Sequence, residues 1–319
     1  MLDKSYKALQ ETLTYLEGDY FENVIETFSN LLDLERFQAD KKYTPEVKQK
    51  LTDCYTKIDP KDYESLLKVM ILQAYKTQNV QANHQMTPDN IGLLLSYLLV
   101  KVLPTKKQID LLDISIGTGN LLFTLFKNLN LQNKHLNLSG IDNDDTQLTL
   151  ASLNATIQKI DVNLYHQDAL EILPLKKQDV IIGDLAVGYY PLDERIKDFT
   201  TKIKSGHSYT HHLIIEQSLR YLKDDGSAVF VVPNDLFSAK NGAELLSFIK
   251  ENAYLQAYLQ LPSDLFTNNK AKKALLFLQK PGANTKQATQ VLLASCPSLK
   301  DQTAFVSFIK QFDSWLSKL

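Results

Sequence analysis

Short apolar runs alternate with helix-like stretches from residue 108 onward, and this alternation constrains the fold more than any other feature. The runs are rich in leucine and β-branched residues, which favour strands: Ile109–Ile114, Leu136–Ile141, Val162–Tyr165, Asp179–Ile182 and Ala228–Val232. The stretches between them are predicted to be helices: Asn120–Asn130, Asp145–Ile160, His211–Tyr221 and Ala243–Lys250. Because such alternation builds right-handed βαβ units, the sequence predicts an α/β fold with a parallel, doubly wound sheet.

The C-terminal part departs from this alternation. Tyr254–Leu261 and Ala274–Gln279 are separated by a segment that is too short to hold a crossover helix. Strands joined without a crossover pair antiparallel, so we expect an antiparallel pair that closes the sheet. A last strand at Val291–Ala294 and a terminal helix are expected to follow.

The first 80 residues show only helical periodicity. Apolar residues recur at steps of three and four in Tyr6–Leu16, Phe21–Leu32 and Asp62–Tyr75, and Thr44-Pro45 is typical of a helix start. We therefore predict an all-helical domain at residues 1–80 and a sheet domain at residues 81–319. Thr87-Pro88 is expected to begin the next helix, with Thr87 as its N-cap, and to run to about Leu103.

Composition excludes several classes of protein. The net charge of −2 gives no overall basic field for a nucleic acid, although a local groove is compatible with it. Cys54 and Cys296 lie far apart, which predicts neither a zinc site nor a disulfide framework and suits a reducing compartment. The charged N-terminus is unlike a signal peptide, and the longest apolar run is shorter than a membrane span. We expect a soluble cytoplasmic protein without a bound metal.

A glycine-containing loop, DISIGTGN, follows the first predicted strand and spans Asp113 to Asn120. Glycines there permit a tight turn and allow a ligand to approach the backbone and the helix N-terminus. The third glycine of a dinucleotide loop is replaced by Leu122, so the loop alone fits a nucleotide-type site and an ordinary strand–helix turn equally well.

Carboxylates end the next two strands. Asp142 and Asp144 of GIDND come about twenty residues after the glycines, where a carboxylate accepts hydrogen bonds from ribose hydroxyls; capping of the following helix is the alternative. Asp168 of HQDAL reaches the same edge of the sheet and is placed to accept from an adenine amine, or it is simply a loop residue.

Together with a strand ending at Asp184, these motifs resemble class I S-adenosylmethionine-dependent methyltransferases. The stretch NHQMTPDNIG, Asn83 to Gly92, is similar to a segment of N6-adenine DNA methyltransferases, including the modification subunits of type I restriction systems. DDGSAVFVVPNDLF and LPSDLF followed by ALLFLQK extend the resemblance over about residues 83–280. Bacterial adenine-specific methylases with an N-terminal helical domain are the group it is most similar to. The resemblance implies a Rossmann-like sheet and S-adenosylmethionine as cofactor.

The resemblance also implies roles for single residues. It places Gln85, Thr87 and Pro88 in the cofactor pocket and Asp113, Gly117 and Gly119 at the methionine end. It places Asp142 on the ribose and Asp168 on the adenine ring. The same motifs supply the remaining expected cofactor contacts: Asn120, Asn143, Ala169 and Asp184.

The expected catalytic motif departs from its family. Amine methyltransferases carry Asn/Asp-Pro-Pro-Tyr/Phe here, in which the first side chain accepts from the amine and the aromatic ring stacks on a flipped base. This chain has DLAV, which retains Asp184 and has Val187 in place of the aromatic residue. Tyr189 or Tyr190 is expected to supply a ring or to pack in the core. A basic loop follows, containing Arg195, Lys197, Lys202 and Lys204, which either meets phosphates or is an ordinary solvated loop.

The sequence thus favours an N6-adenine DNA methylase, with Asp184, Tyr189 and Tyr190 as catalytic candidates and DNA as the nucleic-acid substrate. Methylation of RNA or of a protein amide is an alternative. Another is a cofactor-binding module without catalysis, whose N-terminal helices bind a protein partner or a second subunit. A nicotinamide dehydrogenase is disfavoured because it leaves the Thr87-Pro88 segment unexplained.

Overall fold

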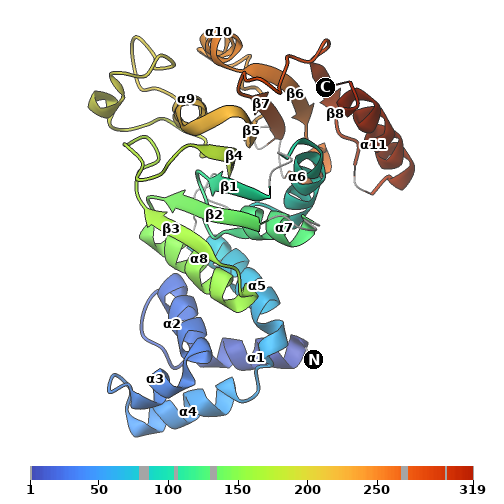
Figure 1. Ribbon diagram of the computed structural model, residues 1–319. Helices are drawn as coiled ribbons and strands as arrows, with labels where there is room; N and C mark the ends of the chain where they lie inside the picture. The colour runs from blue at the N-terminus through green and yellow to red at the C-terminus, as the bar shows by residue number, and fades with distance from the viewer. Residues whose placement is uncertain are drawn as a thin grey trace.

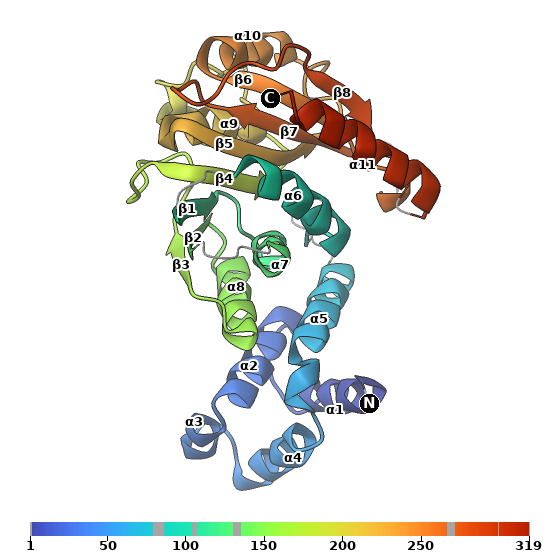
Figure 2. The ribbon, with the colours of Figure 1, turned by 45° about the vertical axis from the view of Figure 1, so that its right-hand side comes forward.

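The computed structural model describes residues 2–78, 86–103, 107–129, 135–266, 272–298 and 300–318. The N-terminal helices form one end of the molecule, and a sheet with helices on both faces forms the other (Figure 1). Figure 2 shows the helix α5 (Tyr63–Thr77) leading from the N-terminal helices toward the sheet. This arrangement agrees with the predicted order of helical and α/β parts, while the predicted boundary at residue 80 lies outside the described residues.

Side chains cap the start of several N-terminal helices, which pack their apolar residues together. Asp19 and Glu22 form a reciprocal capping box at the start of α2, and the Thr44 hydroxyl accepts from the Val47 N–H at the start of α4. Their apolar faces meet around Phe28, Leu51 and Leu67. The elements are α1 (Leu2–Leu13), α2 (Tyr20–Leu32), α3 (Leu34–Ala39), α4 (Pro45–Tyr55), the 3₁₀ turn η1 (Pro60–Asp62) and α5 (Tyr63–Thr77).

The short helix α3 was not predicted. Asp33 ends α2, and its side chain accepts from the Arg36 N–H, so the same residue starts the next helix. Six residues are too few to show a helical repeat in the sequence. The Asp33 cap is therefore the local sequence signal for α3.

The helix α6 (Asp89–Val102) begins later than predicted. Its N-cap is Pro88, which has no side-chain cap, so the prediction that Thr87 caps this helix is wrong. The Thr87 hydroxyl instead donates to an oxygen of Asp184, at 2.9 Å. The Thr87 side chain therefore bonds to a residue distant in the sequence and does not cap the helix that follows it.

The sheet confirms the predicted α/β class. Eight strands within the described residues run in the order β3-β2-β1-β4-β5-β7-β6-β8. The strands β1 to β5 are parallel, whereas β7 pairs antiparallel with both β5 and β6, as expected for the closing pair. Their bounds are β1 (Gln108–Asp113), β2 (His135–Asp142), β3 (Val162–His166), β4 (Gln178–Asp184), β5 (Leu222–Pro233), β6 (Tyr254–Gln260), β7 (Lys273–Gln279) and β8 (Leu292–Ser295).

Helices cover the sheet on both faces. One apolar core joins the sheet to α6, α7, α8 and α11, and a second core joins its other face to α9 and α10 (Figure 1). The bounds are α7 (Asn120–Asn128), α8 (Asp145–Gln158), α9 (Thr210–Tyr221), α10 (Gly242–Asn252) and α11 (Gln302–Leu316), with the 3₁₀ turns η3 (Asp193–Ile196) and η4 (Ser263–Leu265). Central strands such as β4 are buried on both faces, which explains their continuous apolar sequence.

The N-terminal helices pack on α8, through α2 and α5. Leu150 of α8 is fully buried in the core of the N-terminal helices, and Tyr75 of α5 donates to the Gln147 side chain of α8 at 3.0 Å. The two parts of the chain therefore share a buried contact close to the carboxyl edge of the sheet. None of the helices in the described part of the chain has the length and apolar character that crossing a bilayer requires.

Candidate cofactor and acceptor site

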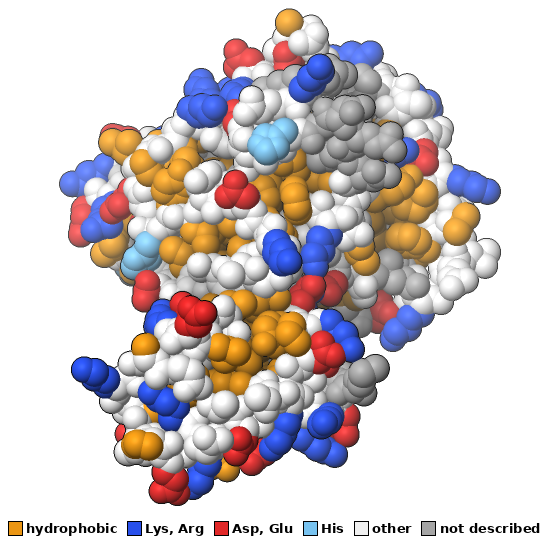
Figure 3. Space-filling model, turned by 60° about the horizontal axis from the view of Figure 1, so that its bottom comes forward, with side chains coloured by type: hydrophobic (Ala, Val, Ile, Leu, Met, Phe, Trp, Pro, Cys, Tyr) orange, Lys and Arg blue, Asp and Glu red, His pale blue; other side chains and the backbone are white. Residues whose placement is uncertain are grey.

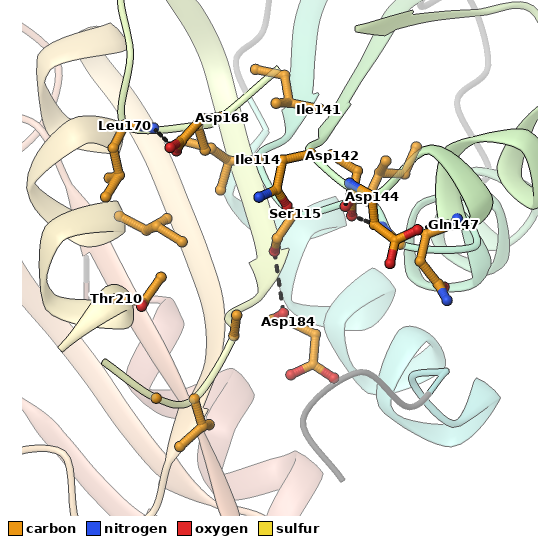
Figure 4. A pocket seen from close by; sticks show the side chains of 18 of the residues that line it. Ile114, Ser115, Ile141, Asp142, Asp144, Gln147, Asp168, Leu170, Asp184 and Thr210 are labelled. Atoms are coloured by element: carbon orange, nitrogen blue, oxygen red, sulfur yellow. Dashed lines mark hydrogen bonds between the residues drawn. The ribbon is translucent and has the colours of Figure 1, made fainter. Parts of the chain in front are cut away.

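A cleft of about 480 Å³ opens at the carboxyl ends of β1, β2 and β4. Figure 4 shows Asp142, Asp144, Asp168 and Asp184 arranged around it, with Thr210 of α9 on one side. In a parallel sheet the carboxyl ends of neighbouring strands meet at one edge, so residues distant in sequence converge there. The cleft thus lies where the sequence placed its candidate residues.

The glycine loop forms one wall of the cleft. Gly117 has φ 53° and Gly119 has φ 78°, conformations that residues with a side chain rarely adopt. The Gly117 N–H donates to Asp142 at 2.8 Å, which ties the loop after β1 to the end of β2. A Cβ at Gly117 would meet nothing within 4 Å, so this backbone faces open space at the cleft.

The two carboxylates of GIDND, Asp142 and Asp144, differ in position. The sequence left ribose binding and helix capping open for both. Asp144 caps α8 by accepting from the Gln147 N–H at 3.1 Å. Asp142 accepts from the backbone N–H groups of Gly117 and Asp144 and also lines the cleft. Asp142 is therefore the better candidate for a ribose, whereas Asp144 acts at least as a helix cap.

Asp168 and Tyr190 form a linked pair on the opposite wall. The Tyr190 hydroxyl donates to one Asp168 oxygen at 2.7 Å, and the other oxygen accepts from the Leu170 N–H at 2.9 Å. Burial and the bond to Asp168 raise the pKa of Tyr190 well above its ordinary value of 10, so its hydroxyl stays protonated. Tyr190 is only 6% exposed, and the structure therefore favours the core interpretation for its ring.

Asp184 lies at the end of β4 with both carboxylate oxygens engaged. One oxygen accepts from Thr87, and the other is 2.5 Å from the Lys273 ammonium of β7. The backbone carbonyl of Asp184 accepts from the Ser115 hydroxyl at 3.2 Å, a contact drawn in Figure 4. Two residues far apart in the sequence thus hold the Asp184 carboxylate, and a third holds its backbone.

Asn120 links the segment before α6 to the glycine loop. Its side-chain amide donates to the Thr87 carbonyl at 2.6 Å and to Asp89 at 2.8 Å. Its side-chain oxygen is buried without a hydrogen-bond partner, and Asn120 lines the cleft. An unpaired buried acceptor of this kind is satisfied when a bound ligand supplies a donor.

Asp113 lies behind the cleft lining and is fully buried. Burial raises its pKa to about 8, and the nearby Asp142 and Asp184 carboxylates act in the same direction, although the Ser115 N–H opposes them. Asp113 is therefore neutral at pH 7, and one of its oxygens has no hydrogen-bond partner.

An aromatic cluster borders the cleft in the segment that follows β4. Tyr189 is 58% exposed and stacks on Tyr209, with ring centroids 4.9 Å apart. The Tyr209 ring also contacts His211 and His212, whose pKa values burial lowers to about 3 and about 4. Tyr189 therefore presents a supported ring to the cleft, near the exposed Val187 that replaces the family's aromatic residue.

The structure brings most of the predicted residues to this one cleft. The predicted residues that line it are Thr87, Gly117, Asn120, Asp142, Asn143, Asp168, Ala169, Asp184, Tyr189 and Tyr190. Pro88, Asp113 and Gly119 support the lining without being part of it. Gln85 lies outside the described residues. The role of each residue in binding stays a prediction.

Several lining residues were missed by sequence reasoning. Tyr75 lies in α5, and Met86 precedes the Thr87-Pro88 segment. Thr118 lies within the glycine loop, Gln147 follows GIDND, and Gln167 precedes Asp168. The helical periodicity of α5 gave no sign that Tyr75 reaches the cleft. Lys273 was missed as well, because nothing in the sequence near either residue indicates a pair with Asp184.

Charges outside the cleft are mixed. In the basic loop, Arg195 pairs with Glu171 at 2.6 Å, so part of its charge is compensated. On the face shown in Figure 3, lysine and arginine side chains are interspersed with acidic ones. Contact of the loop with phosphates stays a prediction. No group of three or more possible metal ligands occurs among the residues that the structure describes.

The fold and the cleft together define a class I S-adenosylmethionine-dependent methyltransferase. The family model for N-6 DNA methylases matches residues 61–306, and the chain belongs to this family. A Bacillus subtilis (strain 168) protein of uncharacterized function, YtxK, is 44% identical over 236 residues, covering 74% of this chain and 71% of that protein.

Solved structures agree with this assignment. A Listeria monocytogenes protein classed as a class I S-adenosylmethionine-dependent methyltransferase shares 35% identity and a TM-score of 0.86, covering 99% of this chain and 98% of that one. The methyltransferase subunit of a type I restriction-modification system from Streptococcus thermophilus shares the fold at 16% identity and a TM-score of 0.63, covering 92% and 74%.

The cofactor of this class is S-adenosylmethionine, and the residues of the cleft fit it. The Gly117 backbone faces open space, the Asn120 oxygen lacks a partner, and carboxylates end β2 and β4. Such donors and acceptors suit a ligand that carries hydroxyl, amine and carboxylate groups together with a cation.

Proposed function

We propose that this protein methylates the exocyclic amine of adenine in DNA, with S-adenosylmethionine as the methyl donor. The observation that carries the proposal is the place of Asp184: an acidic side chain at the end of β4, in the same cleft as the glycine loop and Asp142. The match to the N-6 DNA methylase family supports the same substrate.

The cofactor would be held by residues from several strand ends. Asp142 would accept from the ribose, Asp168 would face the adenine ring, and Asn120, Gly117 and Thr87 would surround the methionine end. Because Tyr190 already donates to one Asp168 oxygen, the hydrogen-bonding capacity that remains for an adenine amine is reduced.

The bound cofactor would supply an electrophilic methyl group on a sulfonium. Asp184 would accept a hydrogen bond from the substrate amine and orient its nitrogen lone pair along the line of displacement. As the nitrogen–carbon bond forms, the electrons of the carbon–sulfur bond stay on sulfur, and the nitrogen then loses a proton to water. Tyr189, stacked on Tyr209, would supply the ring on which the base lies.

The first test is cofactor binding and methyl transfer by cofactor-free protein. S-adenosylmethionine is expected to raise the melting temperature, because a ligand that binds only the folded state stabilises it. Label from the methyl group is expected to appear in adenine of unmethylated DNA. A lack of label in DNA, with cofactor bound, would contradict the adenine assignment.

A matched pair of variants then tests the catalytic residue. Asp184→Ala is expected to lower transfer by at least about 100-fold, the usual effect of removing a group that orients the reacting atoms. Asp179→Ala removes a paired, buried carboxylate from the other end of β4 and is expected to retain transfer in the folded protein. Equal losses in the two variants would mean that Asp184 acts only through stability.

A second candidate function is a cofactor-binding module that does not transfer the methyl group. It is favoured by Val187 in place of the aromatic residue and by the engagement of both Asp184 oxygens. In that case cofactor binding persists, and no label enters DNA, RNA or protein fractions. Label that enters RNA or protein alone would indicate a different amine acceptor. A protein partner or second subunit for the N-terminal helices stays a prediction.

A further inference from the structure

Lys273 contacts Asp184 at the cleft and directly precedes the ALLFLQK motif, so it lies outside every predicted motif. It is the first residue of β7, where its backbone pairs with Pro233 of β5. Asp184 pairs with Val231 on the other side of β5. The Lys273 side chain therefore extends across β5 to place its ammonium group 2.5 Å from the Asp184 carboxylate.

Little water reaches this ion pair. The Lys273 side chain is 19% exposed and the Asp184 side chain 12% exposed. In such surroundings an unpaired charge is strongly unfavourable, and two opposite charges in contact largely cancel each other's field. Thr87 donates to the second carboxylate oxygen, so Asp184 is held from two sides.

The charge of this site matters for the proposed reaction. The cofactor carries a positive sulfonium before transfer, whereas its demethylated form, S-adenosylhomocysteine, carries a neutral thioether. A lone carboxylate in the cleft would bind the cation more tightly than the neutral form. Binding energy of that kind stabilises the ground state and does not lower the barrier.

We propose that Lys273 is the positioning residue of the acceptor site: it fixes the Asp184 carboxylate and cancels its charge. Asp184 then adds little preference of its own for the cationic over the demethylated cofactor. This inference rests on the proposed function, because it concerns the cofactor of the same cleft. It adds a residue from the antiparallel closing strand to a site otherwise built from the parallel strands and their loops.

The sheet supplies a matched control in Lys223, near the start of β5. Lys223 pairs with Asp179, at the opposite end of β4, at 3.0 Å and with Asp110 at 2.7 Å. Both aspartates are almost buried, with side chains 6% and 11% exposed. Replacing Lys223 thus breaks a comparable ion pair in the same sheet without changing the charge at the cleft.

The experiment measures the affinities of S-adenosylmethionine and S-adenosylhomocysteine by calorimetry. In Lys273→Met, the preference for the cationic form is expected to rise about tenfold over the wild type, as a unit charge at close range in poorly hydrated surroundings implies. Lys273→Arg and Lys223→Met are expected to keep the wild-type preference. The double variant Lys273→Met with Asp184→Asn is expected to return to it, because the uncompensated carboxylate is gone.

Lys273→Gln separates charge from folding. The glutamine keeps a hydrogen-bond donor for Asp184, so this variant is expected to fold even if Lys273→Met does not. It is expected to show the same raised preference for S-adenosylmethionine over S-adenosylhomocysteine. An unchanged preference in the neutral variants overturns the inference, and so does a raised preference that persists in the double variant. If the wild type binds neither ligand, the proposed function fails and this inference fails with it; the other two outcomes leave the proposed function standing.

Discussion

At the residue scale, three aspartates near the glycine loop have three different environments. Asp113 is fully buried and neutral, because burial raises its pKa to about 8. Asp142 accepts from two backbone N–H groups, and Asp184 is paired with Lys273. Aspartate thus serves as a neutral buried group, a loop anchor and one half of an ion pair at one edge of the sheet.

The pKa of Asp113 predicts a pH-dependent penalty on stability. Between the ordinary pKa of 3.8 and the folded pKa of about 8, the unfolded chain ionises Asp113 while the folded protein keeps it protonated. The penalty is absent below pH 4 and grows as the pH rises to 8. Asp113→Asn removes it, so the variant should gain stability relative to the wild type by up to about 1.4 kcal/mol per pH unit in this window.

Urea denaturation of both proteins at pH 5, 6, 7 and 8 measures this gain. Asp110→Asn is the control: burial acts to raise the pKa of Asp110, but hydrogen bonds from Asn137 and Lys223 lower it to about 2. Because Asp110 is ionised in both states above pH 5, its variant should differ from the wild type by a constant amount. A constant difference for Asp113→Asn as well would show that Asp113 is not held neutral.

At the element scale, the turn between β1 and α7 contains two glycines, Gly117 and Gly119, whose surroundings differ. A Cβ on Gly119 would lie 2.3 Å from the Phe123 ring, whereas one on Gly117 would meet nothing within 4 Å. Both residues have positive φ, so both substitutions carry backbone strain. Only the one at Gly119 also disturbs the packing of α7 on its turn.

Alanine at each position should therefore separate stability from binding. Gly119→Ala is expected to lower the free energy of unfolding by roughly 3 kcal/mol, from strain together with overpacking. Gly117→Ala is expected to lower it by only about 1 kcal/mol but to weaken binding of S-adenosylmethionine, because its methyl group projects into open space at the cleft. Urea denaturation and calorimetry measure the two effects, and equal losses of stability would contradict this division.

At the scale of the whole molecule, the helical part and the sheet are joined by a shared core. Leu150 of α8 is fully buried among residues of the N-terminal helices, and Tyr75 of α5 lines the cleft. Burial of Tyr75 raises the pKa of its hydroxyl, which donates to the Gln147 side chain. The helical part therefore contributes directly to the site, and we expect the two parts to unfold together.

Leu150→Ala tests this coupling. Removing a fully buried leucine is expected to cost about 2–5 kcal/mol. The single tryptophan, Trp315, lies in α11 on the sheet core and reports on that part by fluorescence, while far-UV circular dichroism follows all helices. Both midpoints should fall together in urea. A fall in the circular dichroism midpoint alone would show that the helical part unfolds independently.

The sequence by itself determined the order of strands and helices, the antiparallel closing pair and most of the cleft. These features depend on local periodicity and on the rule that parallel strands end at one edge. Asp142, Asp168 and Asp184 were found for that reason, since each ends or closely follows a predicted strand.

Only the tertiary structure decided which partners these residues have. Thr87 donates to Asp184 rather than capping α6, Tyr190 donates to Asp168, and Lys273 crosses β5 to reach Asp184. Such pairs join positions about 20 to 100 residues apart, and neither member carries a local signal for the other. Charge and hydrogen bonding around Asp184 are set by packing between strands, which periodicity along the chain does not encode.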